Sequence, residues 1–529
     1  MPRNTSHEPD ERAPLLRKDT SPPATPELDH GAPPVSHRNK KLYATSVTFS
    51  IVFFYVLGEL MQMGPRTRIF ESIYCHQYYA DHDPSVIGDD GWSVPEDVCN
   101  RNGKVQDQVA SLKGWQMLFD GIPSIILAVP YGALADKYGR KPFVFLNLLG
   151  LFLQSISIST ICYFPAVFPI HLVWLSSAFF VLGGGPTVLI ALVYSVLADS
   201  VPWDERASTF FRLQAAQLVA EIIGPSIGSA LMSHDLWLPV YVGLTLDAIT
   251  VFSTLIALPE TLNARLADPE LESVEVFSDS ASSSDSSNGF GALIRRNIRD
   301  LAQNFKSALD FVAHNITVSL LVFTFLSHVI SRSAMEVLFQ YVPHRFGWSI
   351  SEVGYLFSLR AVAHIVLLLG ILPAVSHFLI TKAAADIRKK DLVISKASVV
   401  LCAVGAYLIG LAPTAVLATI SLVIYTLGGG FHAVARSLVT SLVEPHHVGR
   451  LYTAISILDN LGSLIAGPLL SIFFRFGIKL GGFWQGLPFF GLGLMFTFVA
   501  AAVWCVRLPG PGEDPAVEAD PTHDAHASP

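Results

Sequence analysis

Twelve long apolar stretches divide this chain, and they constrain its fold more than any other feature. Each can form a helix of about 20 residues, the length that crosses the ~30 Å hydrocarbon core of a bilayer. The sequence therefore predicts an all-α membrane protein, with twelve transmembrane helices in two six-helix bundles. The stretches lie near residues 42–63, 114–135, 142–162, 172–197, 209–231, 237–258, 316–340, 351–374, 392–412, 414–441, 451–475 and 482–506.

The composition agrees with a polytopic membrane protein and excludes several other classes. Of 529 residues, 51% are hydrophobic and 15% are charged, compared with about 25% charged residues in ordinary soluble domains. The net charge of −8 comes from acidic loops and tails, so no nucleic-acid partner is implied. No phosphate-binding loop, catalytic carboxylate pair or metal-ligating pattern stands out, so we expect no enzyme, no cofactor and no metal site.

The polar segments predict how the bundles are connected. The expected parts are a disordered tail at 1–40, a bundle at 41–261 with an extracytosolic loop at 64–113, a linker at 262–312, a second bundle at 313–507 and a disordered tail at 508–529. Lys and Arg concentrate in short cytoplasmic loops, and their distribution here places both tails and the linker in the cytosol.

The first tail contains Glu11, Leu15 and Leu16 in the spacing E-x-x-x-L-L. This resembles an acidic dileucine sorting signal of the kind that directs proteins to vacuolar or lysosomal membranes. Such short patterns also occur by chance, so the sequence leaves two locations open, the plasma membrane and the vacuolar membrane.

The stretch from Gly132 to Pro142, with the letters GALADKYGRKP, joins the second and third apolar stretches. Its three cations place it on the cytosolic side. Gly139 permits a backbone conformation that is closed to residues with a Cβ, and Pro142 suits the first turn of the next helix. Asp136 is the single carboxylate among these cations, and a generic basic turn between two helices does not account for it.

This stretch resembles the motif G-x-L-a-D-r-x-G-r-k of the major facilitator superfamily, a family of secondary transporters that carry it between their second and third helices. The resemblance implies that the chain moves a small-molecule substrate across a lipid bilayer by alternating access. It also implies a cytosolic gate formed by Gly132, Asp136, Gly139, Arg140 and Lys141.

The two halves of the sequence repeat one another. Leu182-Gly-Gly-Gly recurs as Leu427-Gly-Gly-Gly, and three further landmarks follow at a nearly constant offset. These landmarks are Asp199 with Glu444, Arg206 with Arg450, and Gly224-Pro225 with Gly467-Pro468. Such a duplication matches two six-helix halves with a substrate site between them. The charged members lie at cytosolic helix ends, where we expect two gate salt bridges, Asp199 with Arg206 and Glu444 with Arg450.

Charged groups within the apolar stretches are costly, so each is expected to face a partner or a water-filled path. The candidates for proton coupling or for the substrate cavity are Asp247, Glu221, Asp120, Arg360, Arg436 and Asp459. Asp247 and Glu221 lie nearer the middle of their spans than Asp120 and rank above it as proton carriers. Arg332 and Glu336, four residues apart, are expected to pair with each other.

The fifth apolar stretch contains Gly224, Pro225 and Gly228 in the spacing G-P-x-x-G. This resembles a motif in the fifth helix of drug/proton antiporters, where it implies sealing of the cavity. Close packing by small residues is the alternative interpretation.

The first extracytosolic loop contains Cys75 and Cys99, the two cysteines that lie outside the apolar stretches in an oxidising compartment, so a disulfide is expected there. The surrounding residues Glu71–Cys75, Tyr78-Tyr79 and Asp120–Pro123 resemble the branch that includes the proton-coupled folate transporter and many fungal transporters. This resemblance leaves the direction of transport open, because the folate carrier is a symporter whereas the G-P-x-x-G motif indicates export.

Three functions remain open from the sequence. The first is proton-coupled export of a metabolite or drug-like compound by a monomeric transporter. The second is proton-coupled import of a small organic anion or nutrient, and the third is a receptor or scaffold that has kept the fold without transport.

Overall fold

The computed structural model describes residues 35–201, 203–261, 316–381, 387–443 and 448–506. Within these ranges it contains helices and no strands. Ten helices are long and apolar enough to cross a membrane, and the number is twelve when two bent helix pairs each count as one span. The predicted linker at 262–312 and the predicted tail at 508–529 lie outside the described residues, as do Glu11, Leu15 and Leu16. Of the tail predicted at 1–40, residues 1–34 also lie outside them, whereas residues 35–40 are helical and begin α1, so the prediction of disorder was wrong there.

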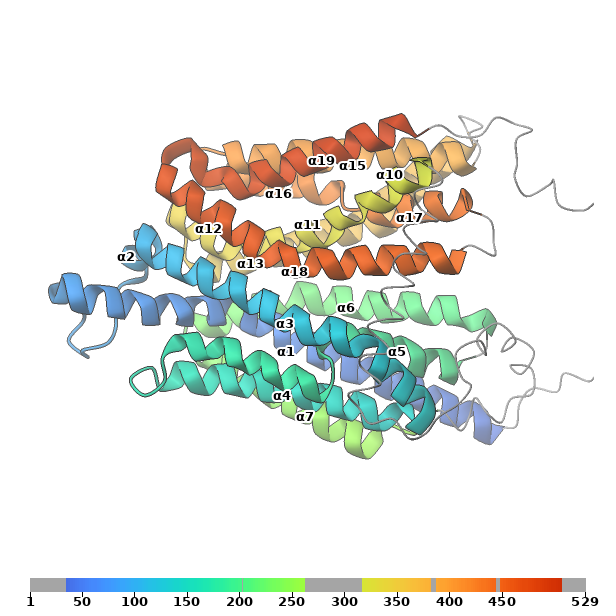
Figure 1. Ribbon diagram of the computed structural model, residues 1–529, viewed down its shortest axis with the longest axis horizontal. Helices are drawn as coiled ribbons and strands as arrows, with labels where there is room; N and C mark the ends of the chain where they lie inside the picture. The colour runs from blue at the N-terminus through green and yellow to red at the C-terminus, as the bar shows by residue number, and fades with distance from the viewer. Residues whose placement is uncertain (1–34, 202, 262–315, 382–386, 444–447, 507–529) are drawn as a thin grey trace, which may run out of the picture.

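The first half forms one bundle, coloured blue to green in Figure 1. Its helices are α1 (Val35–His82), α2 (Glu96–Arg101), α3 (Gly103–Tyr138), α4 (Arg140–Tyr163), the 3-10 helix η2 (Ile170–Leu182), α5 (Gly185–Ser200), α6 (Trp203–Met232) and α7 (Leu238–Ala257).

The second half forms the other bundle, coloured yellow to red in Figure 1. Its helices are α10 (Ile316–Thr324), α11 (Leu326–Glu336), α12 (Leu338–Phe346), α13 (Ile350–Val366), the π-helical turn η6 (Leu367–Ile371), α14 (Leu372–Thr381), α15 (Ile387–Leu411), α16 (Ala415–Leu427), α17 (Phe431–Ser441), α18 (Val448–Leu480), the 3-10 helix η8 (Gly482–Gly486) and α19 (Leu487–Cys505).

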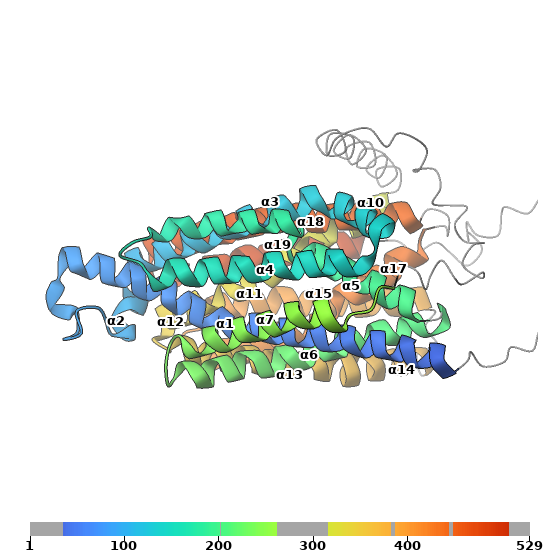
Figure 2. The ribbon, with the colours of Figure 1, turned by 90° about the horizontal axis from the view of Figure 1, so that it is seen from below.

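Several helices extend beyond the apolar stretches that predicted them. The first begins at Val35 and continues to His82, well past the apolar residues that end near 63. The region 64–113 is thus largely helical, with non-helical backbone mainly between α1 and α2. Hydropathy reports only the length that crosses lipid, because helical hydrogen bonding can continue into water wherever other residues stabilise the helix. Figures 1 and 2 show the outer end of α1 and α2 projecting beyond the other helices.

The repeated glycine triplets interrupt equivalent spans in the two halves. One triplet separates η2 from α5 and the other separates α16 from α17. A Cβ on Gly183 would collide with the backbone of Asn147 in α4, and a Cβ on Gly428 would lie 2.6 Å from the Ser398 carbonyl oxygen in α15. Each triplet therefore lets a span approach the backbone of the preceding span closely. This shared role is the structural counterpart of the repeat in the sequence.

Two helix pairs join the halves, α3 with α18 and α6 with α13. In the first pair, a Cβ on Gly114 would lie 3.1 Å from the Gly467 carbonyl oxygen. In the second, a Cβ on Gly354 would lie 3.1 Å from the Pro225 carbonyl oxygen. The two glycine-proline landmarks thus sit at the two interfaces between the halves, where small residues allow close backbone approach.

We expect Gly183→Val and Gly428→Val each to destabilise the protein by about 1–3 kcal/mol, because the added side chain meets backbone that cannot move aside. Gly370→Val is the matched control, since a Cβ there meets no atom within 4 Å. Thermal unfolding of the three purified variants in one detergent measures the effect. Equal unfolding temperatures for Gly183→Val and Gly370→Val would contradict the packing role.

Candidate transport pathway and its gates

The outer ends of the halves are joined between α3 and α18. Arg475 binds Asp107 through two nitrogens, with Nε at 2.7 Å from Oδ1 and a terminal nitrogen at 3.1 Å from Oδ2. One turn away along α18, the Ser471 hydroxyl donates to the Ala110 carbonyl oxygen at 2.7 Å. A two-pronged guanidinium–carboxylate pair is strong and directional, so this contact holds the two helices in one register.

The second interface, between α6 and α13, is closed by serines and one ion pair. The Ser358 hydroxyl donates to the Ile222 carbonyl oxygen at 2.6 Å and accepts from Ser226 at 2.7 Å. Deeper in the membrane, Arg360 pairs with Glu221. Both were candidates for the cavity, and the structure places them in contact across the halves.

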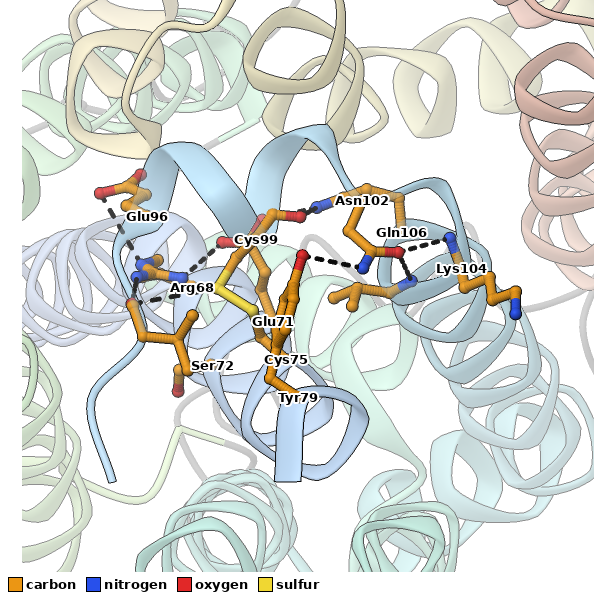
Figure 3. The surroundings of a disulfide bond; sticks show 12 residues. Arg68, Glu71, Ser72, Cys75, Tyr79, Glu96, Cys99, Asn102, Lys104 and Gln106 are labelled. Atoms are coloured by element: carbon orange, nitrogen blue, oxygen red, sulfur yellow. Dashed lines mark hydrogen bonds and ion pairs between the residues drawn. A yellow bond between two sulfur atoms is a disulfide. The ribbon is translucent and has the colours of Figure 1, made fainter. Parts of the chain in front are cut away.

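Helix α2 is fixed to the first half by a disulfide and by buried polar contacts, shown in Figure 3. Cys75 of α1 and Cys99 of α2 are bridged, with their Cα atoms 5.6 Å apart. Arg68 of α1 contacts Glu71 at 2.8 Å and Glu96 at 3.7 Å. Closing a loop of this size lowers the entropy of the unfolded chain by an amount worth about 3 kcal/mol on the chain-entropy model. The short helix is therefore held as a rigid extension of α1.

The fixed helix α2 contacts the second half. The Glu96 carboxylate accepts the Ile350 backbone N–H at 2.8 Å, which caps the start of α13. The Asn100 side-chain amide donates to the Trp348 carbonyl oxygen at 3.3 Å, and the Asn100 backbone carbonyl oxygen lies 2.8 Å from Nδ1 of His344. The disulfide thus stabilises a third outer contact between the halves.

The cytosolic side differs from the outer side. Between described residues, the hydrogen bonds and ion pairs that join the halves extend from the outer ends only as far as the Glu221–Arg360 pair. Toward the cytosol, a Cβ on Gly132 or Gly370 would meet nothing within 4 Å, and no residue of α14 is buried. Within the described residues, the polar contacts that join the halves therefore lie on the outer side and not on the cytosolic side.

Arg140 organises the cytosolic end of the first half. Its guanidinium binds Asp199 of α5 at 3.1 Å and also Asp136 of α3. The Glu260 carboxylate, just after α7, accepts the backbone N–H groups of Arg140 at 2.8 Å and Lys141 at 3.2 Å, so it caps the start of α4. One arginine and one carboxylate thus connect four of the segments that end at this surface.

The turn itself is a single residue. Gly139 has φ 111° and separates α3 from α4, and a Cβ there would lie 2.5 Å from Glu260 Oε2. Glycine is required on both counts, because this φ disfavours side chains and the carboxylate occupies the space. Gly132 lies about two turns earlier in α3, where a Cβ would meet no atom within 4 Å.

Two gate salt bridges were predicted, Asp199 with Arg206 and Glu444 with Arg450. Asp199 takes Arg140 as a partner, which the prediction of an Asp199–Arg206 pair did not include. Arg206 lies near the start of α6, and its role in the gate stays a prediction. Glu444 and the side chain of Arg450 lie outside the described residues.

A polar cluster surrounds Asp247 in the middle of the first half. Asp247 is buried, its Oδ2 accepts from Gln62 of α1 at 3.3 Å, and its Oδ1 has no partner among the described residues. Arg66 connects Gln62 at 3.0 Å and Glu59 at 3.4 Å. Gly58 leaves space for the carboxylate, because a Cβ there would lie 3.1 Å from Oδ1. Protonation of Asp247 would therefore alter a connected network.

Asp120 has a different environment. A single oxygen, Oδ1, accepts from Gln116 at 2.9 Å, Gln154 at 2.9 Å and Ser177 at 2.6 Å. These donors come from α3, α4 and η2, so Asp120 joins three segments of one half. This arrangement favours a structural role, and the lower rank of Asp120 as a proton carrier stays a prediction.

Two cations of the second half are exposed, Arg332 of α11 and Arg436 of α17. Arg436 lies over the Phe325 ring with its guanidinium carbon 5.5 Å from the ring centre. Asp459 of α18 is electrostatically attracted to Arg436 without a salt-bridge contact. The expected Arg332–Glu336 pair is absent among the described contacts. Glu336 ends α11 at a 46° bend and lines a small cavity together with Lys113 of α3.

Sequence reasoning missed four important charged residues, namely Arg66, Lys113, Asp107 and Arg475. The first three lie between the first two apolar stretches and were assigned to the outer loop, and Arg475 ends a stretch on the same side. These residues can be identified as charged groups within helices only when the helices are known to continue past the apolar residues.

The G-P-x-x-G motif packs helices together. A Cβ on Gly224 would lie 3.0 Å from Cβ of Leu60, and a Cβ on Gly228 would collide with the Met61 backbone, so both glycines seat α6 on α1. Pro225 faces α13 through its carbonyl oxygen. The structure thus shows close packing at this motif, at the edge of the interface between the halves.

The family model for the Major Facilitator Superfamily matches residues 107–467. The chain belongs to the major facilitator superfamily. It is a secondary transporter of small solutes and not an enzyme. The match runs from α3 to the glycine-proline pair of α18, so it includes parts of both bundles and leaves α1, α2 and α19 outside.

Relatives and solved structures agree with this assignment. The chain is 36% identical to the MFS efflux pump atnC of Emericella nidulans, over 87% of this chain and 86% of that protein. It is 27% identical to the efflux pump ustT of Aspergillus flavus, over 89% of each. The nucleoside transporter NupG, at 14% identity and a TM-score of 0.55, shares the fold over 87% of this chain and 100% of its own.

We expect Asp136→Asn to reduce transport at least about tenfold, because the carboxylate shares Arg140 with Asp199 and an amide cannot replace its charge. Lys137→Gln is the matched control, since Lys137 is exposed and lies over its neighbour Tyr138. Initial flux per inserted protein in proteoliposomes gives the comparison. Equal flux for Asp136→Asn and the parent would remove Asp136 from the gate.

We also expect Asp107→Asn and Arg475→Gln to open the outer side. In a chain carrying Ala110→Cys, a membrane-impermeant thiol reagent should label the outer face of α3 at least about fivefold faster when either charge is removed. The exchange Asp107→Arg with Arg475→Asp should restore slow labelling. Slow labelling in both single variants would show that this ion pair does not hold the outer side closed.

Proposed function

We propose that this chain is a proton-coupled exporter of a small organic compound. The observation that carries the proposal is the buried Asp247 carboxylate, which belongs to a polar network in the first half and whose Oδ1 has no partner among described residues. An acid of this kind can bind and release one proton as the pathway is exposed to each side in turn. The direction of transport is taken from the relatives whose names describe efflux pumps.

Alternating access supplies the mechanism. In the state described here the outer contacts are formed, and we propose that a solute enters from the cytosolic side. Export requires that Arg475 release Asp107 and Arg360 release Glu221, while the cytosolic ends approach each other. The outer side and the cytosolic side are closed in different states. Solute and proton can therefore cross the membrane in opposite directions without an open channel.

Glu221 has a separate role in this proposal. From depth alone it ranked with Asp247 as a proton carrier, yet its carboxylate pairs with Arg360 across the interface. Removing one member of such a pair leaves an uncompensated charge in the membrane, which is costly. We therefore propose that Glu221 and Arg360 form the inner end of the outer gate.

We propose further that the transporter works as a monomer in the plasma or vacuolar membrane. Support for the monomer comes from the pathway itself, because both halves and all the gate residues described here belong to one chain. Support for a vacuolar location is limited to the sequence pattern at Glu11, Leu15 and Leu16.

We expect Asp247→Asn to keep solute exchange and to lose its acceleration by a pH gradient, because an amide is isosteric with the acid and cannot carry a proton. Asp120→Asn is the comparison, since Asp120 accepts three hydrogen bonds and should affect stability more than coupling. Flux in proteoliposomes with and without an imposed gradient measures both. An Asp247→Asn protein that responds to the gradient like the parent would move the carrier elsewhere, with Glu59 and Asp459 next.

A further inference from the structure

Two arginines in the second half differ from most arginines of the helices. Five guanidinium groups are matched by carboxylates within 4 Å, those of Arg66, Arg68, Arg140, Arg360 and Arg475. Arg332 and Arg436 have no such partner among the described residues, and both are exposed. A cation in a membrane span is costly, so an unpaired one signals a site that another group occupies during function.

These two arginines belong to one cluster. The charges of both act on His328 of α11, and Arg436 also acts on His432 of α17. The two imidazole rings lie edge to face with their centres 4.7 Å apart. His328 and His432 therefore connect the surroundings of one guanidinium to those of the other.

One member of the cluster, Arg332, interacts electrostatically with the first half. Tyr55 of α1 experiences the charges of Glu59 and Asp247 from its own half, and that of Arg332 from the other. The acidic and basic sides of the pathway thus meet near Tyr55. A ligand held by the arginines would lie opposite the proposed proton carrier.

The chemistry around the arginines indicates what they bind. Arg436 lies over the Phe325 ring, and His432 adjoins Phe431 and Phe496 with ring centres 5.1 and 6.4 Å away. His432 Nδ1 is buried without a partner in the part of the chain that the structure describes. A planar guanidinium fork matches a carboxylate, while aromatic rings suit an apolar body.

We propose that Arg332 and Arg436 form the solute site, and that the solute is an organic anion with a carboxylate on an apolar or aromatic body. This rests on the proposed function only in that the bound compound is the one transported. Lys113 and Glu336 do not belong to this site, because they face each other in the small cavity under the outer gate.

The test compares an acid with its neutral isostere. The full chain in lipid nanodiscs is titrated with naphthalene-2-carboxylate and naphthalene-2-carboxamide, and then with benzoate against benzamide and decanoate against decanamide. At least one acid should bind about tenfold more tightly than its amide in the parent. Arg332→Gln and Arg436→Gln should each remove most of that preference, and Arg436→Lys should restore it in part because it keeps the charge.

Arg345→Gln is the matched control. Arg345 also lies over aromatic rings, with its guanidinium carbon 5.7 Å from the Tyr341 ring centre, but near the outer end of α12. It should keep the full preference for acids. Unfolding temperatures of all variants establish that each is folded before binding is compared.

Three results would overturn the proposal. They are the absence of a preference for any acid over its amide, an unchanged preference in both glutamine variants, or an equal loss in Arg345→Gln. Binding is measured without a proton gradient, so this test can fail while gradient-driven flux persists. Conversely, the loss of gradient dependence in Asp247→Asn does not depend on the charge of the solute.

Discussion

The cost of placing a charge in a bilayer governs the arrangement of this molecule. A charged side chain at mid-membrane costs at least about 2.5–3.5 kcal/mol on insertion scales, which a chain can offset by pairing charges or by hydrating them. Most guanidinium groups of the spans are paired with carboxylates. These pairs also determine which helix surfaces contact each other, so the need to neutralise buried charge determines the gates as well as the stability.

The pairs have different consequences on the two sides of the membrane. At the outer end, Arg475 with Asp107 and Arg360 with Glu221 join one half to the other, so a change of state must break them. At the cytosolic end, Arg140 joins Asp136 and Asp199 of the same half. This cluster can keep the first half rigid in every state. Asp136 is the most exposed carboxylate of this cluster, because more than half of its side chain is accessible while it pairs with Arg140. It can therefore contact the second half when the cytosolic side closes.

The sequence predicted the spans, the duplication and the cysteine pair because these depend on local apolar length, on repeated landmarks and on topology. It did not predict the partners of most charged groups. Asp199 could be matched with an arginine nearby in sequence or with Arg140 on another helix, and only the rotation of each helix about its axis decides between them. The same applies to Glu336, which lies one turn from Arg332 on α11 but lines a small cavity together with Lys113 of α3.

The duplication explains why two interfaces form but not how strongly each holds. Gly114 and Gly354 occupy corresponding places, each against the backbone of a helix that carries a glycine-proline pair. The polar contacts around them differ, since one interface ends in the two-pronged Arg475–Asp107 pair and the other consists of serine contacts with the deeper Glu221–Arg360 pair. Ion pairs near the surface are screened by solvent, whereas a pair at depth keeps most of its attraction. Opening should therefore begin at the outer pair, and we propose that the separation of Glu221 from Arg360 commits the molecule to the outward state.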